Sequence, residues 1–317
     1  MARLFITGVS GLLGLNLALQ VRDRYTVGGS YHNHLITMDL VETVATDLTS
    51  QESVRDALAI FQPDVIVHTA AYTDVNGCET NPGLARSLNV DAAANVAKAA
   101  TESGAQLVHI STDHLFDGTE PRRTEDDIPE PLNVYAATKL EGELAVTAEC
   151  PDALIVRTNF YGWGSPLKSS FSDWILEGLR EERRLPMFAD SFFSPILIND
   201  LVELIIEMVE RQATGVYNIA GRDRLSKYSF AERLAQTFGY GTENIDQTFA
   251  SEQQTDVVRP SDLSMNCSKL ERLIGRPVPT VDEGLARLRL LENEGRPKQL
   301  RKAARGVEAR HRSMPAQ

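Results

Sequence analysis

The sequence predicts an α/β protein in which helices cover both faces of a doubly wound parallel β-sheet. In the first half of the chain, short and almost continuously apolar segments alternate with helical ones. Parallel strands that are buried on both faces have this continuous apolar character. A glycine-rich turn after the first apolar segment makes the expected sheet Rossmann-type. We expect a smaller substrate-binding part toward the C-terminus.

The first predicted strand covers residues 4–6, and three glycines follow it at a spacing of three. Gly8, Gly11 and Gly14 open a helix whose apolar residues continue through Leu19. Glycine lets the backbone turn tightly and approach a pyrophosphate, and the first turn of a helix offers free N–H groups. The segment therefore predicts a dinucleotide site, with an ordinary strand–turn–helix connection as the alternative.

The second predicted strand, residues 25–30, ends at Ser30. An acidic side chain at this place would hold both adenosine ribose hydroxyls and favour NAD. Since no carboxylate is present to repel a 2′-phosphate, the sequence favours NADP and leaves NAD open. His32 and His34 follow this strand. We expect each of them either to contact the 2′-phosphate of NADP or to be a solvated loop residue.

The remaining elements continue the alternation, and we see no internal repeat. We expect strands at 64–68, 107–111, 154–157 and 215–219. We expect helices at 51–61, 82–103, 170–183, 199–211 and 228–238, with one more around Tyr135. These elements predict a nucleotide-binding domain at 1–159 to which later segments return, a substrate-binding part at 160–292, and a basic tail at 293–317.

Three side chains predict carbonyl chemistry. Tyr135 and Lys139 are four positions apart and share one face of a helix. A nearby ammonium favours the phenolate, so we expect Lys139 to lower the Tyr135 pKa and make the phenol a proton donor or acceptor. Thr112, at the end of a predicted strand, can hold the oxygen that is reduced.

Composition excludes several classes of protein. The 317 residues are 42% hydrophobic and carry a net charge of −12, which argues against a nucleic-acid partner. No apolar stretch approaches the roughly 18–20 residues that span a bilayer. Cys78, Cys150 and Cys267 are scattered and odd in number, which argues against disulfides or a zinc site and for the cytoplasm.

The C-terminal tail differs from the rest of the chain in charge. From Gly295 onward it holds seven Lys or Arg residues against one acid. It lacks a sustained apolar face, so we expect a frayed extension or one draped over the surface, with a partner-binding tail as the alternative.

The ordered set of glycine turn, Ser-Thr-Asp and Tyr-x-x-x-Lys resembles the extended short-chain dehydrogenase/reductases, which act on nucleotide sugars. Within them the chain is most similar to the dTDP-4-dehydrorhamnose reductases over roughly residues 1–290. The strings that carry this resemblance are PDVIVHTAAYTDV (63–75), HISTDHLFDG (109–118), PLNVYAATKLEGE (131–143), LIVRTNFYG (154–162) and RPSDLSMNCSKL (259–270).

The resemblance implies a role for each matching residue. Thr112 would bind the sugar C4 oxygen, Tyr135 would protonate it, and Lys139 would hold the nicotinamide ribose. The cofactor would also be bound by Gly8, Ser10, Gly11, Leu12, Gly14, Ser30, Asp47, Leu48, Ala70, Ala71 and Tyr72. The substrate would be bound by Thr112, Asp113, Phe160 and Arg259, where Arg259 takes the diphosphate or makes a surface ion pair.

Three departures from the family pattern limit what is carried over. His114 stands where related dehydratases have a Glu, which disfavours water elimination and makes His114 a packing residue. Phe160 replaces a Trp that stacks on the sugar, so the identity of the sugar stays open. Asn16 replaces a Glu linked to metal-assisted dimerisation, so we expect no metal and leave a homodimer open.

Two further functions remain as alternatives to reduction of dTDP-4-dehydro-L-rhamnose. The regulatory β subunit of methionine adenosyltransferase also resembles this family, retains an NADP site, and would make the basic tail a docking element. A reductase or epimerase of another nucleotide sugar would use the same site.

Overall fold

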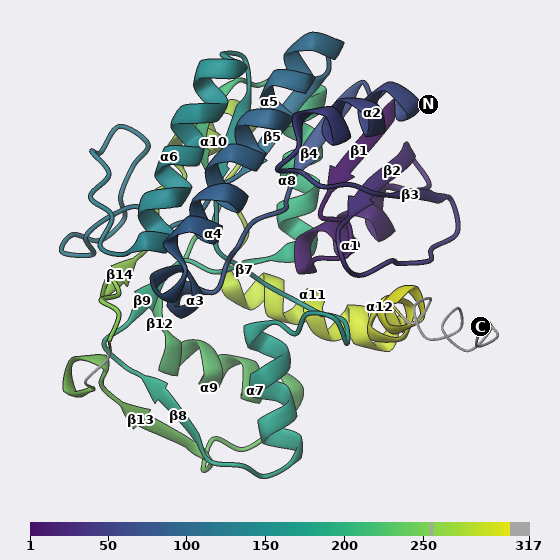
Figure 1. Cartoon of the computed structure of the whole chain (residues 1–317). Helices are drawn as coiled ribbons and strands as arrows, with labels where there is room; N and C mark the ends of the chain where they lie inside the picture. Colours follow the sequence, from purple (N-terminus) through teal and green to yellow (C-terminus); the bar gives the residue numbers. More distant parts are fainter. Residues whose placement is uncertain (254–255, 305–317) are drawn as a thin grey trace, which may run out of the picture.

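Within residues 1–253 and 256–304, which this computed structural model describes, a seven-stranded sheet forms the centre of the molecule (Figure 1). Every neighbouring pair of its strands is parallel, in the order β11-β6-β5-β4-β1-β2-β3. The strands are β1 (Arg3–Thr7), β2 (Thr26–Tyr31), β3 (Val41–Ala45), β4 (Val65–His68), β5 (Gln106–Ile110), β6 (Leu154–Arg157) and β11 (Gly215–Asn218). The predicted doubly wound fold is confirmed.

Helices cover both faces of the sheet. One face carries α1 (Leu12–Val21) and α8 (Ile198–Glu210), and the other carries α2 (Gln51–Phe61), α5 (Ala92–Ser103) and α6 (Val134–Glu149). Successive side chains of β1 enter different cores, since Leu4 and Ile6 pack on the α1 side and Phe5 packs on the α2 side. This two-sided burial explains why three successive residues of the strand, Leu4 to Ile6, are apolar.

The later half of the chain forms a smaller layer at one end of the sheet. Its helices are α7 (Phe171–Arg180), α9 (Lys227–Phe238) and α11 (Val281–Asn293), with a 3₁₀ turn at Ala250–Glu252. The helix α10 (Ser268–Ile274) instead returns to the central sheet, where it packs against β11. Its short strands are β7 (Phe160–Tyr161) with β10 (Ile196–Leu197), β8 (Leu185–Phe188) with β13 (Ile245–Thr248), and β9 (Phe192–Phe193) between β12 (Leu225–Ser226) and β14 (Asp262–Leu263). One apolar core runs from α1 and α8 into this layer without interruption.

The predicted helix at 82–103 is interrupted. It consists of α4 (Pro82–Arg86), a π-helical turn (Ser87–Asp91) and α5, preceded by α3 (Val75–Thr80). Asn89 lies in the π-helical turn, where its side chain accepts from the Tyr72 backbone N–H at 2.8 Å and donates to the Tyr72 carbonyl at 3.2 Å. The wider turn thus ties the helix to the segment that follows β4.

Residues 296–304 of the expected tail are not frayed but lie along the surface of the body as a helix, which the sequence did not predict. They form α12 (Arg296–Ala304), which packs against α1 and α11 and buries Leu300, Ala303 and Ala304. The Ala303 carbonyl accepts a hydrogen bond from the Thr37 backbone N–H at 3.0 Å. These three small or apolar side chains are enough to hold the helix in place because α1 and α11 pack against them. Residues 305–317 of the predicted tail lie outside the described residues.

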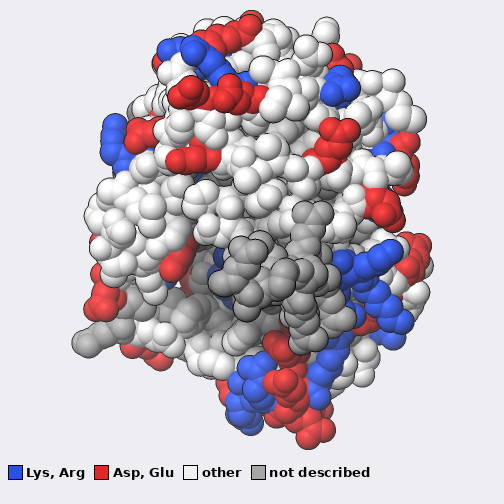
Figure 2. All heavy atoms as spheres, turned by 45° about the vertical axis from the view of Figure 1, so that its right-hand side comes forward, with Lys and Arg blue, Asp and Glu red and all other residues white. Residues whose placement is uncertain are grey.

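Charged side chains of both signs are interspersed over the face shown in Figure 2. Exposed ion pairs join sequence-distant elements, as in Arg24–Glu210 and Arg180–Glu292 at 2.8 Å each. Among the described helices, none is both long and apolar enough to cross a membrane.

Close packing of α6 against the π-helical turn depends on Gly142, since a Cβ there would lie 2.3 Å from the Asn89 carbonyl oxygen. We expect Gly142→Ala to lower the free energy of unfolding by about 1–3 kcal/mol, because backbone must move to admit the methyl group. Urea unfolding measures this change. Gly83→Ala in α4 is the control, since its Cβ would come no closer than 3.9 Å to another atom. Equal stability of the two variants would contradict the packing constraint.

Candidate active site

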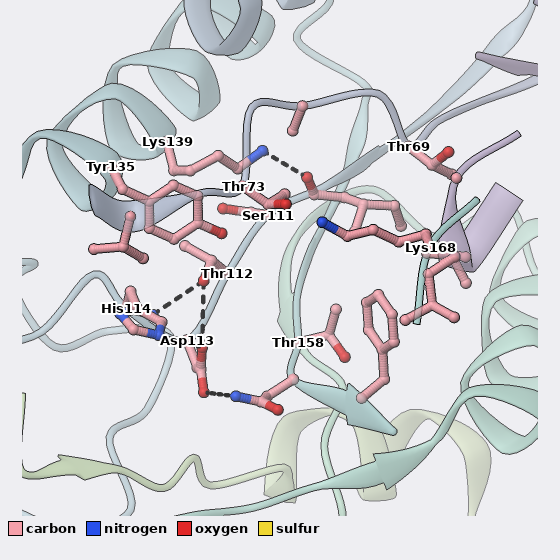
Figure 3. A pocket seen from close by; sticks show the side chains of 18 of the residues that line it. Thr69, Thr73, Ser111, Thr112, Asp113, His114, Tyr135, Lys139, Thr158 and Lys168 are labelled. Carbon is pink, nitrogen blue, oxygen red and sulfur yellow. Dashed lines mark hydrogen bonds and ion pairs between the residues drawn. The ribbon is translucent and has the colours of Figure 1, made fainter. Parts of the chain in front are cut away.

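A cavity of about 470 Å³ opens where the carboxyl ends of β1, β4, β5 and β6 meet the C-terminal layer (Figure 3). Doubly wound sheets bind their ligands at this edge. The cavity brings together nine of the predicted site residues: Ser10, Gly11, Leu12, Ala71, Thr112, Asp113, Tyr135, Lys139 and Phe160.

The glycine turn forms one wall of the cavity. Gly8 has a φ of +70°, and a Cβ there would lie 3.0 Å from Ala70. A Cβ on Gly14 would lie 2.4 Å from the Gly8 carbonyl oxygen, so both positions require glycine. No side chain caps α1, and Ser10 to Leu13 line the cavity. The uncapped N–H groups and the positive end of the helix dipole fit the diphosphate of a dinucleotide.

Thr112 and Asp113 follow β5 and are joined by hydrogen bonds. The Thr112 hydroxyl donates to Asp113 Oδ1 at 3.2 Å, and the His114 backbone N–H donates to Thr112 Oγ1 at 3.2 Å. Asn159 Nδ2 donates to Asp113 Oδ2 at 2.6 Å. These bonds fix both side chains at the cavity wall, within reach of a bound polar group.

The helix α6 presents Tyr135 and Lys139 to the same cavity. Asn133 caps its first turn by accepting from the Ala136 backbone N–H at 2.9 Å. The Lys139 ammonium donates to the Ile110 carbonyl at 2.9 Å, at the end of β5. The helical spacing and this anchor hold the phenol and the ammonium beside Thr112 (Figure 3).

Burial dominates the protonation of both groups. It raises the pKa of the Tyr135 phenol, while hydrogen bonding to Thr112 lowers it by a smaller amount. Burial also lowers the pKa of Lys139 to about 8. The expectation that Lys139 lowers the Tyr135 pKa is therefore not met here. At neutral pH the phenol keeps its proton and the ammonium keeps its charge.

A buried ion pair behind Lys139 was not predicted from the sequence. Glu143 lies one turn after Lys139 and accepts from Arg157 Nε at 3.0 Å and Nη2 at 2.8 Å. Both side chains are about 5% exposed. The Glu143 carboxylate raises the pKa of Lys139 and opposes the larger effect of burial. The spacing of four residues between Lys139 and Glu143 could have indicated that the two side chains lie on the same face of the helix.

Two imidazoles stack beneath the site. The rings of His68 and His109 lie 5.2 Å apart, and His68 Nδ1 hydrogen-bonds to Thr7 Oγ1 at 2.7 Å. Burial lowers the pKa of His68 to about 3 and lowers that of His109 as well. Both rings are therefore neutral around pH 7.

The remaining predicted residues do not line this cavity. Gly8, Gly14 and Ala70 shape the glycine turn from behind. Leu48 packs against the apolar core on the α2 side of the sheet, and Tyr72 packs against the cluster that contains Cys78 and Tyr135. Ser30 is buried with no hydrogen-bond partner for its hydroxyl among the described residues. Asp47 is exposed and accepts from the Thr49 backbone and hydroxyl. Arg259 is exposed and donates to Asn76 Oδ1 at 2.7 Å, which joins the C-terminal layer to α3.

Several cavity residues were missed as site residues or given a lesser role, and three of them have ionisable side chains. His34 lines the cavity beside the glycine turn, and His114 stands edge-on to the Tyr135 ring at 5.6 Å. Lys168 comes from a loop whose position relative to the sheet no sequence pattern indicates. Across the described residues, no group of His, Cys, Asp and Glu side chains is placed to hold a metal ion.

Comparison with known proteins identifies the family. The model for the RmlD substrate binding domain matches residues 2–291. The chain belongs to this family, which lies within the extended short-chain dehydrogenase/reductases.

Two curated relatives differ in kind. The chain is 30% identical to the probable low-salt glycan biosynthesis reductase Agl14 of Haloferax volcanii, over 90% of this chain and 96% of that protein. It is 32% identical to methionine adenosyltransferase 2 subunit beta of Mus musculus, over 87% of this chain and 84% of that protein.

The solved structures with similar folds include dTDP-4-dehydrorhamnose reductases. The enzyme from Bacillus anthracis, in complex with NADP, has a TM-score of 0.81 and 28% identity, covering 92% of this chain and 99% of that one. The counterpart from Clostridium acetobutylicum has a TM-score of 0.80 and 27% identity, with the same coverage.

Two buried neutral histidines predict a pH-dependent stability. Because their folded pKa values lie below the unfolded value, the unfolded chain takes up protons first as the pH falls. From about pH 7 to about pH 5, each should lower the free energy of unfolding by up to about 1.4 kcal/mol per pH unit. Urea unfolding of His109→Leu should therefore show a shallower pH slope than the wild type. His32→Gln, an exposed site, is the control, and a slope equal to wild type in His109→Leu would refute the assignment.

Proposed function

We propose that this protein is an NADPH-dependent reductase of the 4-keto group of a deoxy nucleotide sugar, with dTDP-4-dehydro-L-rhamnose as substrate and dTDP-L-rhamnose as product. One observation carries the proposal: Thr112, Tyr135 and Lys139 line the same cavity as the uncapped glycine turn. The fold similarity to dTDP-4-dehydrorhamnose reductases supports the substrate. The three buried, unpaired cysteines fit a reducing cytoplasm.

The cofactor would lie across the carboxyl edge of the sheet. Its diphosphate would accept hydrogen bonds from the backbone at Ser10 to Leu13, and Lys139 would hold the nicotinamide ribose. When bound, NADPH supplies the hydride for the carbonyl carbon. Ala71 and Thr69 line the path between these two ends of the site. NAD remains the alternative dinucleotide.

Tyr135 would supply the proton that reduction requires. Its buried phenol is protonated at neutral pH, so it can donate to the sugar oxygen as negative charge develops there. The Thr112 hydroxyl would turn its proton from Asp113 to that oxygen and donate a second hydrogen bond. The Lys139 ammonium would stabilise the developing charge through the low-dielectric site. Proton donation, alignment and charge stabilisation thus come from three fixed groups.

The sugar would lie between Asp113 and Phe160. Asp113 can accept hydroxyl hydrogen bonds, and Phe160 offers an apolar face from β7. His114 packs on Tyr135, and without a carboxylic acid at that position a dehydratase is disfavoured. Other 4-keto nucleotide sugars share these features, so a reductase or epimerase of another sugar is the nearest alternative.

A non-catalytic regulatory subunit is the second candidate. The 32% identity to methionine adenosyltransferase 2 subunit beta favours it. The intact Thr112, Tyr135 and Lys139 set favours the enzyme. NADPH binding without turnover of any 4-keto sugar nucleotide, together with capture of a methionine adenosyltransferase catalytic subunit, would establish the regulatory role.

Loss of the phenol hydroxyl should separate chemistry from binding. We expect Tyr135→Phe to lower kcat by about 10²–10⁴-fold, because the proton donor is gone. NADPH affinity, followed by fluorescence, should change little. Tyr240→Phe is the matched control, since Tyr240 lies in the C-terminal layer and does not line the cavity. Wild-type turnover in Tyr135→Phe would refute the mechanism.

The lowered pKa of Lys139 predicts the alkaline limb of the pH profile. Lys139 is charged below about pH 8 and loses its proton above it. The value of kcat/KM for reduction should therefore fall as the pH rises through that region, while Tyr135 stays protonated. Initial rates at saturating NADPH measure this, and Glu143→Gln should move the limb to lower pH. A flat profile well above pH 8 would contradict the role of the ammonium.

A further inference from the structure

Lys168 belongs to a tight turn that overhangs the cavity. The backbone N–H of Ser165 donates to the Lys168 carbonyl at 3.0 Å, and the Lys168 N–H donates back to the Ser165 carbonyl at 3.1 Å. The Ser165 hydroxyl also accepts from the Leu167 backbone N–H at 3.2 Å. Residues 165–168 thus form a closed hairpin rather than a loose loop, and both Leu167 and Lys168 line the cavity.

The base of this turn is fastened to α7. The Asp173 carboxylate accepts from the backbone N–H of Gly164 at 2.8 Å and of Ser170 at 2.9 Å, one residue on each side of the turn. Ser170 in turn caps α7 by accepting from the Asp173 N–H at 3.0 Å. Gly164 is required here, since a Cβ would lie 2.5 Å from the Lys168 carbonyl oxygen. The backbone that carries Lys168 is therefore held in place, and its exposed side chain extends from a fixed turn.

The Lys168 ammonium extends into the cavity. Figure 3 shows its side chain reaching into the space between Thr69, Ser111 and Thr158. The other charged groups of the wall are already engaged, since Lys139 donates to Ile110 and Asp113 accepts from Asn159. No acceptor for the Lys168 ammonium lies within hydrogen-bond or ion-pair distance among the described residues. A cation held over a cavity without an acceptor is placed to receive an anion.

We propose that Lys168 clamps a diphosphate bound in this cavity, an inference that rests on the proposed function. Both nucleotide ligands of that function carry a diphosphate, which offers closely spaced oxyanions to an ammonium. The uncapped end of α1 faces the same space, so helix and lysine would hold a diphosphate from two sides. Lys168 is then a determinant of nucleotide affinity and takes no part in hydride or proton transfer.

Binding experiments with Lys168→Met and Lys168→Arg test this clamp. Methionine keeps the apolar stem and removes the charge, whereas arginine keeps the charge. Three probes are titrated without substrate turnover: NADPH by fluorescence, 2′-AMP by calorimetry, and dTDP by calorimetry in the presence of NADP. Lys298→Met on α12 is the control, because Lys298 is exposed and does not line this cavity.

We expect Lys168→Met to weaken a diphosphate ligand about tenfold, as loss of a charged hydrogen bond does. Lys168→Arg should keep most of the affinity, and 2′-AMP, which carries neither phosphate of the diphosphate, should bind both variants as it binds wild type. Weaker binding of NADPH alone assigns the clamp to the dinucleotide, and weaker binding of dTDP alone assigns it to the sugar nucleotide. Weaker binding of both ligands places Lys168 between the two diphosphates.

Two results would overturn the clamp. One is unchanged affinity of Lys168→Met for both NADPH and dTDP, and the other is an equal loss of affinity for 2′-AMP. Because these titrations need no turnover, failure of the reductase assay would not be mistaken for failure of the clamp.

Discussion

The site depends on where α6 is held. Four contacts fix this helix, and each comes from a different part of the chain. Asn133 caps it and donates to the Val258 carbonyl at 3.0 Å, while Glu79 accepts from the Val134 backbone N–H at 2.7 Å. Gly142 allows contact with the π-helical turn, and Lys139 reaches the Ile110 carbonyl. Tyr135 is therefore positioned by the sheet, by α3 and by the C-terminal layer together.

This placement also determines the charge of the site. Removing water from around Tyr135 and Lys139 favours the neutral form of each group, which keeps the phenol protonated and brings the lysine close to losing its charge. Glu143, itself paired with Arg157, partly restores the ammonium. A reductase needs this combination: an acid that still holds its proton, beside a cation that stabilises the alkoxide. The low dielectric constant of the site makes it unfavourable to bury the Lys139 charge. It also strengthens the interaction of that charge with the developing alkoxide.

Local patterns were enough to predict the elements that carry the cofactor site. The β1 strand, the glycine turn and α1 follow from apolar runs and glycine spacing, and the α2 and β6 bounds agree with the predicted residues. The π-helical turn was not predicted because it depends on the hydrogen bonds between Asn89 and Tyr72. These two residues are distant in sequence, so the periodicity of the helix does not indicate their contact. Strands of two residues carry no readable period. The α12 helix was not predicted because its apolar face is small. The helix is stabilised by packing against α1 and α11, which the sequence does not indicate.

Site residues could be predicted where they are close in sequence and share one face of a helix. They were not predicted where a loop brings them back to the sheet. Tyr135 and Lys139 are paired by one helical turn, so their shared face needed no tertiary information. Lys168 reaches the cavity through a hairpin fixed by Asp173, which only the folded chain reveals. Ser30 was predicted near the adenosine ribose from its place at the end of β2, and the structure shows its hydroxyl buried.

The most direct test of the account follows the hydride itself. Deuterium is placed at the transferable position of NADPH, dTDP-4-dehydro-L-rhamnose is supplied, and the product is examined by NMR and mass spectrometry. Reduction by the proposed mechanism would place one deuterium at C4 of dTDP-L-rhamnose. Recovery of unreduced keto sugar, or deuterium absent from C4, would contradict it.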